Sequence, residues 1–304
     1  MSYQIKVYHS SMYELLCSFL IYTTRKWTDD LDWGQEWIDD VSCRLDPTIV
    51  EQIDTFRSSE MIDYDILYLW TILREPKTDI PSCIHYLATC DLDELYAQTT
   101  PYVDHVTKVD VARIRDSYTP LIKAWYEQYF AEIEHTIIPF LEEDAKEKQQ
   151  LISKMDPIDL VEYATNGVVV EPLDHLHTII LMPMIHSRPV NYYVKLNGML
   201  LIQYAIDLPE TNEHQVPIGL ARFTRALSDP KRLLILRYLA QELRSTSEVA
   251  EIMQMTPEAV GSHIRILRVA GLLRTHLNDE NEKYSIRADG IAEMQLFLES
   301  YLRL

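Results

Sequence analysis

Through the first half of the chain, hydrophobic residues recur at intervals of three and four positions, which is the spacing of one face of an α-helix. The pattern predicts helices that begin at Ser11, after Asp30, at Pro47 and near Asp63. It stays helical from residue 109 to residue 153. The N-terminal region is therefore expected to be mostly helical.

The first of these helices also carries a local start signal. Ser11 stands where an N-cap belongs, and Glu14 follows three residues later. In a capping box the serine side chain accepts a hydrogen bond from the third helical amide, while the glutamate side chain accepts one from the amide of the cap. We therefore expect Glu14 to bond to the start of its own helix.

The pattern changes at Val168. Residues 168–170, 178–182 and 191–206 are rich in β-branched, aromatic and aliphatic side chains, which favour strands. Asn197-Gly198 divides the last of these runs, and this pair is a strong signal for a two-residue hairpin turn. We expect a small antiparallel β-sheet of three or four strands packed on the helices. The predicted fold class is thus mainly α with a small antiparallel sheet, an α+β arrangement.

Residues 227–286 predict a helix, then two helices joined by a very short turn, and finally a β-hairpin. Only Gln254 and Met255 separate the two joined helices, so these helices must cross sharply, as in a helix-turn-helix. The start and stop signals of the second helix are an N-cap, an N1 proline, an acid in the first turn and a terminal glycine: Thr256, Pro257, Glu258 and Gly271. The hairpin that follows is interpreted as the wing of a C-terminal winged helix-turn-helix.

The polar stretch of residues 207–216 is interpreted as a linker. We therefore expect two domains, a helical domain with a small sheet at residues 1–208 and a winged helix at residues 217–304. The chain has 304 residues and is 47% hydrophobic, which is enough to bury two cores.

Cysteine usage and hydropathy indicate the compartment. The four cysteines, at positions 17, 43, 83 and 90, form neither a metal-like cluster nor a disulfide pattern. The N-terminus lacks the order of a signal peptide, and no apolar run has the length of a membrane span. We expect a soluble, cytoplasmic protein without membrane association.

The net charge of −19 is distributed unevenly. Residues 217–304 hold 12 Lys and Arg against 11 Asp and Glu, a net charge of +1. Residues 1–216 hold 16 against 36, a net charge of −20. The acidic charge therefore belongs to the N-terminal part, where it serves mainly as a solubilising surface and weakens non-specific attraction to nucleic acid.

Two stretches of the C-terminal region resemble a known family. Residues 227–236, Leu-Ser-Asp-Pro-Lys-Arg-Leu-Leu-Ile-Leu, resemble the opening helix of ArsR-family winged helices, and residues 260–273 resemble the recognition helix and following strand of that family. The resemblance implies a one-component bacterial transcription regulator that binds double-stranded DNA as a homodimer. Many members hold a metal through a Cys-x-Cys element, but residues 245–249 lack cysteine, so we expect no metal and no cofactor.

Side chains that read bases must reach the groove edges, and phosphate contacts need hydrogen-bond donors. Arg265 is the first candidate for a base or phosphate contact, with Ser262, Glu258 and Pro257 near the groove floor. Gly261 would allow a close approach of the helix to the DNA backbone. The remaining DNA-binding candidates are two residues at helix starts, a second arginine and a wing lysine: Thr246, Thr256, Arg268 and Lys283. Lys231 and Arg232 are also expected to face the duplex.

The last helix opens near Asp289 and carries an apolar stripe, which could pack on a partner subunit or on the N-terminal domain of its own chain. In the family this helix commonly contacts the partner subunit, so we favour dimerisation. The stripe consists of Ile291, Met294, Phe297, Leu298 and Tyr301.

A histidine group and a tryptophan pair could each form a binding site, but each also has a simpler interpretation. The pair His175 and His177, with His186 nearby, has a spacing that could ligate a metal, but ordinary histidines are the preferred interpretation because no cysteine or carboxylate cluster completes a set. Trp33 and Trp37 could line a ligand pocket, but core packing is preferred.

No catalytic motif is present, so we expect no enzyme and no catalytic residues. The N-terminal domain is expected to sense a small molecule or a protein. The alternative function is an acidic protein-interaction module whose winged helix contacts a partner, which the acidic turn of the wing favours: Asp279, Glu280 and Glu282.

Overall fold

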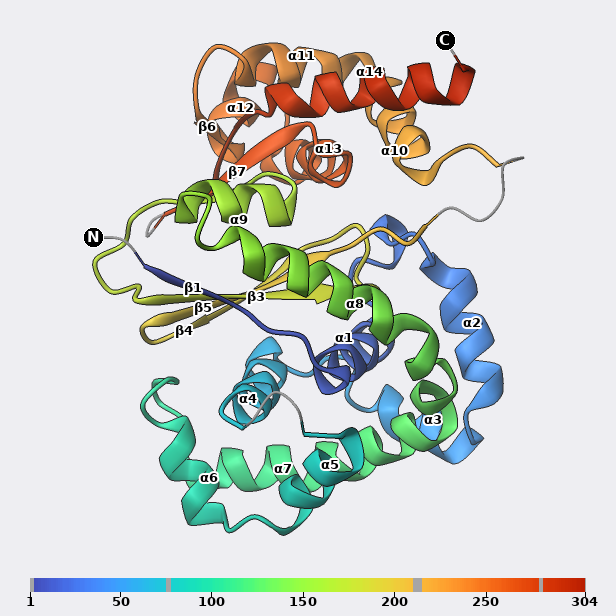
Figure 1. Ribbon diagram of the computed structural model, residues 1–304, viewed down its shortest axis with the longest axis vertical. Helices are drawn as coiled ribbons and strands as arrows, with labels where there is room; N and C mark the ends of the chain where they lie inside the picture. The colour runs from blue at the N-terminus through green and yellow to red at the C-terminus, as the bar shows by residue number, and fades with distance from the viewer. Residues whose placement is uncertain (1–2, 75–77, 210–214, 279–280, 304) are drawn as a thin grey trace. The chain divides into compact units, whose positions relative to one another are not determined.

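The structure, a computed structural model, describes residues 3–74, 78–209, 215–278 and 281–303. The described chain separates into two compact units (Figure 1). The N-terminal unit comprises residues 3–151 and 175–207, and the C-terminal unit comprises residues 152–174 and 208–304. In the described part of the chain, every helix is too short or too polar to span a lipid bilayer. The expected class, mainly α with small sheets, is confirmed.

Most helices of the N-terminal unit begin at or near the positions that the apolar periodicity indicates, but the helix expected near Asp63 begins at Met61, and the helices at Ile80–Thr89 and Leu92–Thr99 were not predicted. Aspartate, serine or threonine caps several of the helices. They are α1 (Ser11–Thr24), α2 (Gly34–Arg44), α3 (Pro47–Asp54), α4 (Met61–Ile72), α5 (Ile80–Thr89), α6 (Leu92–Thr99), α7 (Lys108–Trp125) and α8 (Ala131–Leu151). A 3-10 turn, η1 (Thr28–Asp30), precedes α2, and a π-helical turn, η2 (Tyr126–Phe130), joins α7 to α8.

A four-stranded sheet forms the centre of the N-terminal unit. Its strands, in spatial order, are β1 (Gln4–Val7), β3 (Thr178–Met184), β5 (Met199–Ala205) and β4 (Tyr192–Leu196). The expectation of an antiparallel sheet is wrong for most of it, because β1–β3 and β3–β5 are parallel. Strands β3 and β5 are buried on both faces, and such strands are typical of parallel sheets. The hairpin signal is confirmed, since β4 and β5 are antiparallel and Gly198 has a φ of +76°.

Helices cover both faces of this sheet. The hydroxyl of Tyr204 in β5 bonds to Asp144 of α8. The side chain of the neighbouring residue Gln203 lies near the hydroxyl of Tyr68 in α4. Because successive side chains of a strand point to opposite faces, α8 and α4 lie on opposite sides of the sheet (Figure 1). The aromatic and aliphatic side chains between these layers form the core.

The C-terminal unit contains the expected winged helix-turn-helix. Its elements are α10 (Ile218–Leu227), α11 (Pro230–Leu239), β6 (Arg244–Ser245), α12 (Thr246–Met253), α13 (Pro257–Val269), β7 (Leu273–Leu277), β8 (Lys283–Ile286) and α14 (Ala288–Leu302). One core of buried residues from α10, α11, α12, α13, β7 and β8 holds them together, including Phe223, Ile235, Val249, Ile264 and Tyr284.

The C-terminal unit also contains residues that the expected boundary assigns to the N-terminal domain. Helix α9 (Pro157–Thr165) and strand β2 (Val168–Val170) belong to it, and β2 pairs with β7 in a sheet of order β2-β7-β8-β6. Val168–Val170 was expected in the sheet of the N-terminal domain. The apolar run identifies a strand correctly but does not say which distant strand it pairs with.

Candidate nucleic-acid interface

Helix α13 is held by a strong local start and an apolar face. The side chain of Thr256 accepts a hydrogen bond from the amide of Ala259 at 3.3 Å, and Pro257 occupies the first turn. Val260, Ile264 and Leu267 recur at helical spacing and are at most 2% exposed. The sequence prediction for this helix is therefore confirmed from its cap to its buried face.

The opposite side of α13 is exposed and polar. Glu258, Ser262 and Arg265 are spaced by four and three residues, so they share one face, and all three are exposed. The Ser262 hydroxyl donates to the Glu258 carbonyl at 3.1 Å, and the Arg265 guanidinium reaches the Ser262 hydroxyl at 3.5 Å. Thr256 and Pro257, at the start of the helix, are also exposed. Seven of the nine sequence candidates thus lie at this helix, and five of them are exposed.

Gly261 lies half-buried within α13, next to the start of α12. A β-carbon at this position would meet Thr246 Cγ2 at 4.0 Å, which is ordinary van der Waals contact. Packing inside the chain therefore does not require glycine here. The expectation that glycine serves a close approach to DNA stays a prediction.

The start of α12 differs from the sequence expectation. Its N-cap is Ser245, whereas Thr246 or Ser247 was expected. The Ser245 amide donates to the Glu248 carboxylate at 2.6 Å, and the Glu248 amide donates to the Ser245 hydroxyl at 3.3 Å. These hydrogen bonds hold the pKa of Glu248 below its usual value. Thr246 is the first residue of the helix, half-buried, and the Ser-x-x-Glu spacing could have identified this cap from the sequence.

Arg268 turns toward the wing. Its guanidinium lies 3.5 Å from the Glu282 carboxylate and 5.9 Å from the centre of the Tyr284 ring. The Tyr284 hydroxyl donates to Glu282 at 2.7 Å, and burial raises the pKa of Tyr284 to about 12. Lys283 is half-buried in β8. Asp279 and Glu280, also expected in the acidic turn, lie outside the described residues.

Two basic residues have structural partners. Arg232 was expected to face the duplex, but it is 7% exposed and donates to the carbonyls of Ala226 at 2.7 Å and Arg225 at 2.6 Å. It thereby satisfies carbonyls at the end of α10, so this expectation is wrong. Arg274 of β7 lies 2.5 Å from Glu162 of α9. Lys231, by contrast, is exposed at the start of α11.

Helix α14 exposes its apolar stripe. Ile291, Leu298 and Leu302 are spaced by seven and four residues, so they share a face, and they are 45%, 44% and 52% exposed. Phe297 contacts the core of its own unit, since its ring lies 6.2 Å from that of Phe223. Large apolar side chains that cluster on one exposed face are typical of an interaction surface.

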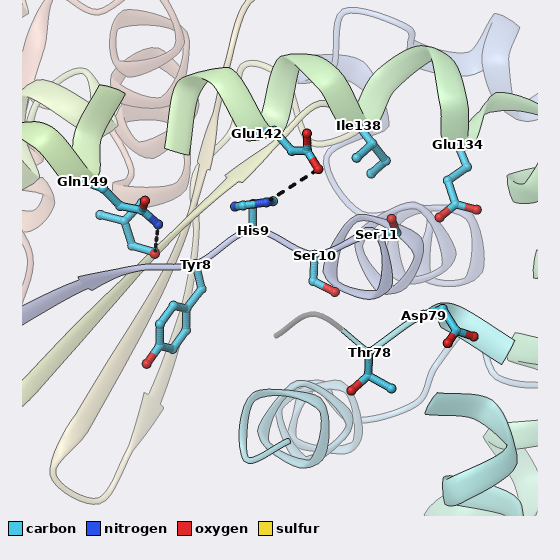
Figure 2. Close-up of a pocket in the computed structure, with 11 residues that line it drawn as sticks. Tyr8, His9, Ser10, Ser11, Thr78, Asp79, Glu134, Ile138, Glu142 and Gln149 are labelled. Atoms are coloured by element: carbon cyan, nitrogen blue, oxygen red, sulfur yellow. Dashed lines mark hydrogen bonds and ion pairs between the residues drawn. The ribbon is translucent and has the colours of Figure 1, made fainter. Parts of the chain in front are cut away.

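The N-terminal unit contains a pocket of about 680 Å³, drawn in Figure 2. It lies between the end of β1, the start of α1 and one face of α8. Carboxylates reach it from two elements, Asp79 at the cap of α5 and Glu134 and Glu142 on α8. His9 lies 3.8 Å from Glu142. Its described lining residues include no lysine or arginine.

His186, Trp33 and Trp37 lie together in the N-terminal unit. His186 does not join His175 and His177 but lies in the core, where its Nδ1 contacts Glu14 and its Nε2 lies 2.8 Å from the Tyr129 hydroxyl. Trp37 donates to that hydroxyl at 2.7 Å. The rings of Trp33 and Trp37, both half-buried, pack against His186. No group of three or more metal-ligating side chains occurs among the described residues.

Comparisons with known proteins concern the C-terminal unit. A family model described as "Bacterial regulatory protein, arsR family" matches residues 229–275. An ArsR-like transcriptional regulator from a Rhodococcus species is 25% identical over 27% of this chain and 78% of its own, with a TM-score of 0.26. NolR from Sinorhizobium fredii is 25% identical over 31% of this chain and 95% of its own, with a TM-score of 0.26.

A homodimeric winged helix-turn-helix DNA-binding domain from Mycobacterium bovis is 22% identical over 31% of this chain and 87% of its own, with a TM-score of 0.26. No curated protein matches the chain. The residues that match the family model run from the cap of α11 through α12 and α13 into β7. Residues 229–275 of the C-terminal unit therefore match the model of the ArsR family of bacterial regulatory proteins, and they fold as a winged helix-turn-helix.

Proposed function

We propose that this protein is a DNA-binding transcriptional regulator whose helix α13 enters the major groove. The observation that carries the proposal is the exposed face of Glu258, Ser262 and Arg265, which lies opposite the buried face of the same helix. Arg265 can donate two hydrogen bonds to a guanine edge or to a phosphate, and Glu258 can accept from a cytosine amino group. The other side chains of this helix then set its depth in the groove.

The remaining candidates would position the protein on the DNA backbone. Thr256 and Pro257 lie at the start of α13, where backbone amides and the helix dipole favour a phosphate. Thr246 begins α12, while Arg268 and Lys283 lie at the wing. Contacts of this kind fix the register of a protein on the duplex but do not read its sequence.

We propose that the active form is a homodimer paired through α14. The exposed face of Ile291, Leu298 and Leu302 is the supporting feature. A two-fold dimer would present two copies of α13 to the half-sites of a palindromic operator. A regulator of this kind acts in the cytoplasm and needs no catalytic residue.

The test is a gel-shift against the upstream region of the protein's own gene, repeated over a salt series. Binding through phosphates should weaken steeply as salt rises, because counterions are released. Arg265→Ala should lower the affinity by about 1–3 kcal/mol if the arginine makes a bidentate base contact. The matched control is Arg237→Ala, an exposed arginine of α11, which should leave affinity unchanged.

Two outcomes would contradict the assignment. Equal affinity for Arg265→Ala and the unmodified protein would remove Arg265 from the interface. Absence of salt-dependent binding to any duplex would favour the alternative, in which the winged helix contacts a protein partner. A partner that binds the acidic N-terminal unit would then be basic.

We further propose that the pocket beside α8 receives the signal. Its volume lies in the range of small-molecule sites, and its carboxylates favour a small cation such as an amine or a guanidinium. Putrescine and guanidinium should raise the melting temperature of the protein, and Glu142→Gln should reduce that shift. Glu143→Gln, the neighbouring exposed residue outside the pocket, should leave it unchanged.

A further inference from the structure

Residues 152–174, named here the wing segment, have an unusual path. The chain leaves the N-terminal unit at the end of α8, forms α9 and β2 within the C-terminal unit, and then returns to form β3. Both ends of the wing segment are therefore covalently continuous with the N-terminal unit. The polar stretch after β5 is a further connection between the units.

Backbone pairing attaches the wing segment to the wing. Strand β2 runs parallel to β7, with Val168 opposite Thr275 and Val170 opposite Leu277. The Thr275 amide donates to the Gly167 carbonyl at 2.8 Å, and the Glu171 amide donates to the Leu277 carbonyl at 3.1 Å. The three valines of β2 are at most 8% exposed. The strand therefore covers the outer edge of β7 and contributes to the interior of the unit.

Side chains add to this attachment. Glu162 of α9 lies 2.5 Å from Arg274. Glu171 lies 3.0 Å from His276 Nδ1, and His276 Nε2 lies 2.9 Å from the Ser285 hydroxyl of β8. The polar contacts thus extend from the wing segment across both strands of the wing.

The fit between the wing segment and β7 is also close. Gly167 has a φ of +122°, and a β-carbon there would lie 2.5 Å from the Leu273 carbonyl oxygen. That contact is far too short for any other residue type, so the backbone of the segment can approach β7 this closely only with glycine. The segment and the wing therefore move as one body unless β2 detaches.

We infer that the wing segment is the element that couples the N-terminal unit to the wing. Helix α8 lines the pocket with Glu134, Ile138, Glu142 and Gln149, and it ends at Leu151, directly before the wing segment. A change in α8 acts on one end of the wing segment, and a change at the start of β3 acts on the other end. Either change can therefore act on β7 through the segment. Only a signal with different affinity for two arrangements can shift such an equilibrium. The consequence for DNA rests on the proposed function, but the coupling itself does not.

The test measures amide hydrogen exchange at Thr275 and Glu171 in the full chain, because these two amides donate across the β2–β7 pairing. Tyr192→Phe loosens the N-terminal unit alone, because it removes the 2.6 Å hydrogen bond from Tyr192 to Asp65. With its ends held less firmly, β2 should detach more often, and exchange at both amides should rise about threefold to tenfold. A direct check of the attachment is Glu162→Gln, which should also raise exchange, whereas Asp159→Asn on the exposed side of α9 should not.

The decisive variant carries flexible Gly-Ser insertions at both ends of the wing segment, in the exposed stretches 152–154 and 172–174. Such insertions cost little loop entropy but remove the mechanical connection. In this background Tyr192→Phe should no longer change exchange at Thr275 and Glu171. The same insertion in the turn after α3, residues 57–59, is the control and should preserve the effect.

Two results would overturn the inference. One is unchanged exchange at the wing when Tyr192→Phe is introduced into the chain without insertions. The other is an equal rise with and without the insertions, which would assign the coupling to the stretch after β5. Failure of the proposed DNA binding is distinguishable from both, because it would appear in the gel-shift and not in the exchange of the wing.

Discussion

The guanidinium of Arg268 lies 3.5 Å from the carboxylate of Glu282, so the end of α13 is joined to the wing by an ion pair. Both side chains are partly exposed, 28% and 38% respectively, and such pairs contribute little to stability. In the proposed DNA complex the pair would matter more for binding than for stability, because Glu282 would offset positive charge at the surface proposed to meet phosphate.

Glu282→Gln should tighten DNA binding. The substitution removes a negative charge beside Arg268 and keeps the side-chain shape, so repulsion of phosphate falls. We expect a gain of about 0.5–1 kcal/mol at low salt, which shrinks as salt screens the charges. A filter-binding series at two salt concentrations measures it. The control is Glu242→Gln, which replaces an exposed glutamate before β6. An equal gain in the control would show that the effect comes from net charge alone.

Gly261→Ala tests whether this glycine allows the DNA backbone to come close or only weakens the helix. The site has room for a β-carbon, and alanine favours a helix over glycine by about 0.5–1 kcal/mol, so thermal stability should rise. If the DNA backbone approaches this position closely, affinity should fall at the same time. Stability is measured by urea unfolding and affinity by gel-shift. Unchanged or higher affinity in the stabilised variant would show that the glycine has no role in approach.

The stability of the N-terminal unit should depend on Asp65. Burial raises the pKa of this carboxyl from 3.8 to about 6, although Tyr192 donates a hydrogen bond to it at 2.6 Å. The folded state therefore keeps a proton that the unfolded state has lost between about pH 4 and pH 6. Because the folded state binds more protons there, stability falls as pH rises through this window, by roughly 2 kcal/mol.

Asp65→Asn should remove this dependence, because the amide stays neutral and its oxygen can still accept from Tyr192. Urea unfolding at pH 4.5 and pH 7 measures the difference, and the variant should gain relative stability at pH 7. Asp159→Asn, an exposed aspartate of α9, is the control. Parallel pH profiles for Asp65→Asn and the unmodified protein would contradict the assignment.

Leu298→Glu should dissociate the dimer. Leu298 lies at the centre of the exposed face of α14, between Ile291 and Leu302, and a charge there would be buried without a partner on pairing. Sedimentation should show a monomer that retains its helical content. Ser300→Glu adds the same charge on the opposite side of the helix and should leave the dimer intact. A monomeric unmodified protein would refute the pairing itself.

Much of the C-terminal unit, and the β4–β5 hairpin of the N-terminal unit, could be predicted because their signals are local. The cap, the N1 proline and the apolar spacing of α13 lie within one helix, and Asn197-Gly198 specifies a hairpin through its own backbone geometry. The same local reasoning failed at Glu14. Its position after Ser11 suggested a capping box, but the N-cap is Ser10 and the carboxylate accepts from the amides of Ile185 and His186.

The sequence by itself determined many of the elements: the helices with clear apolar periodicity, the hairpin, the winged helix-turn-helix and the polar face of α13. These follow from propensities and periodicities that act within a few residues. Only the tertiary structure decided that β1, β3 and β5 run parallel, that Arg232 is buried and that β2 joins the wing. Strand β1 meets β3, and β2 meets β7, across more than a hundred residues, whereas Arg232 bonds to a carbonyl only six residues away. In each case the outcome depends on which surfaces and backbone edges meet, and local propensity and periodicity do not encode that choice.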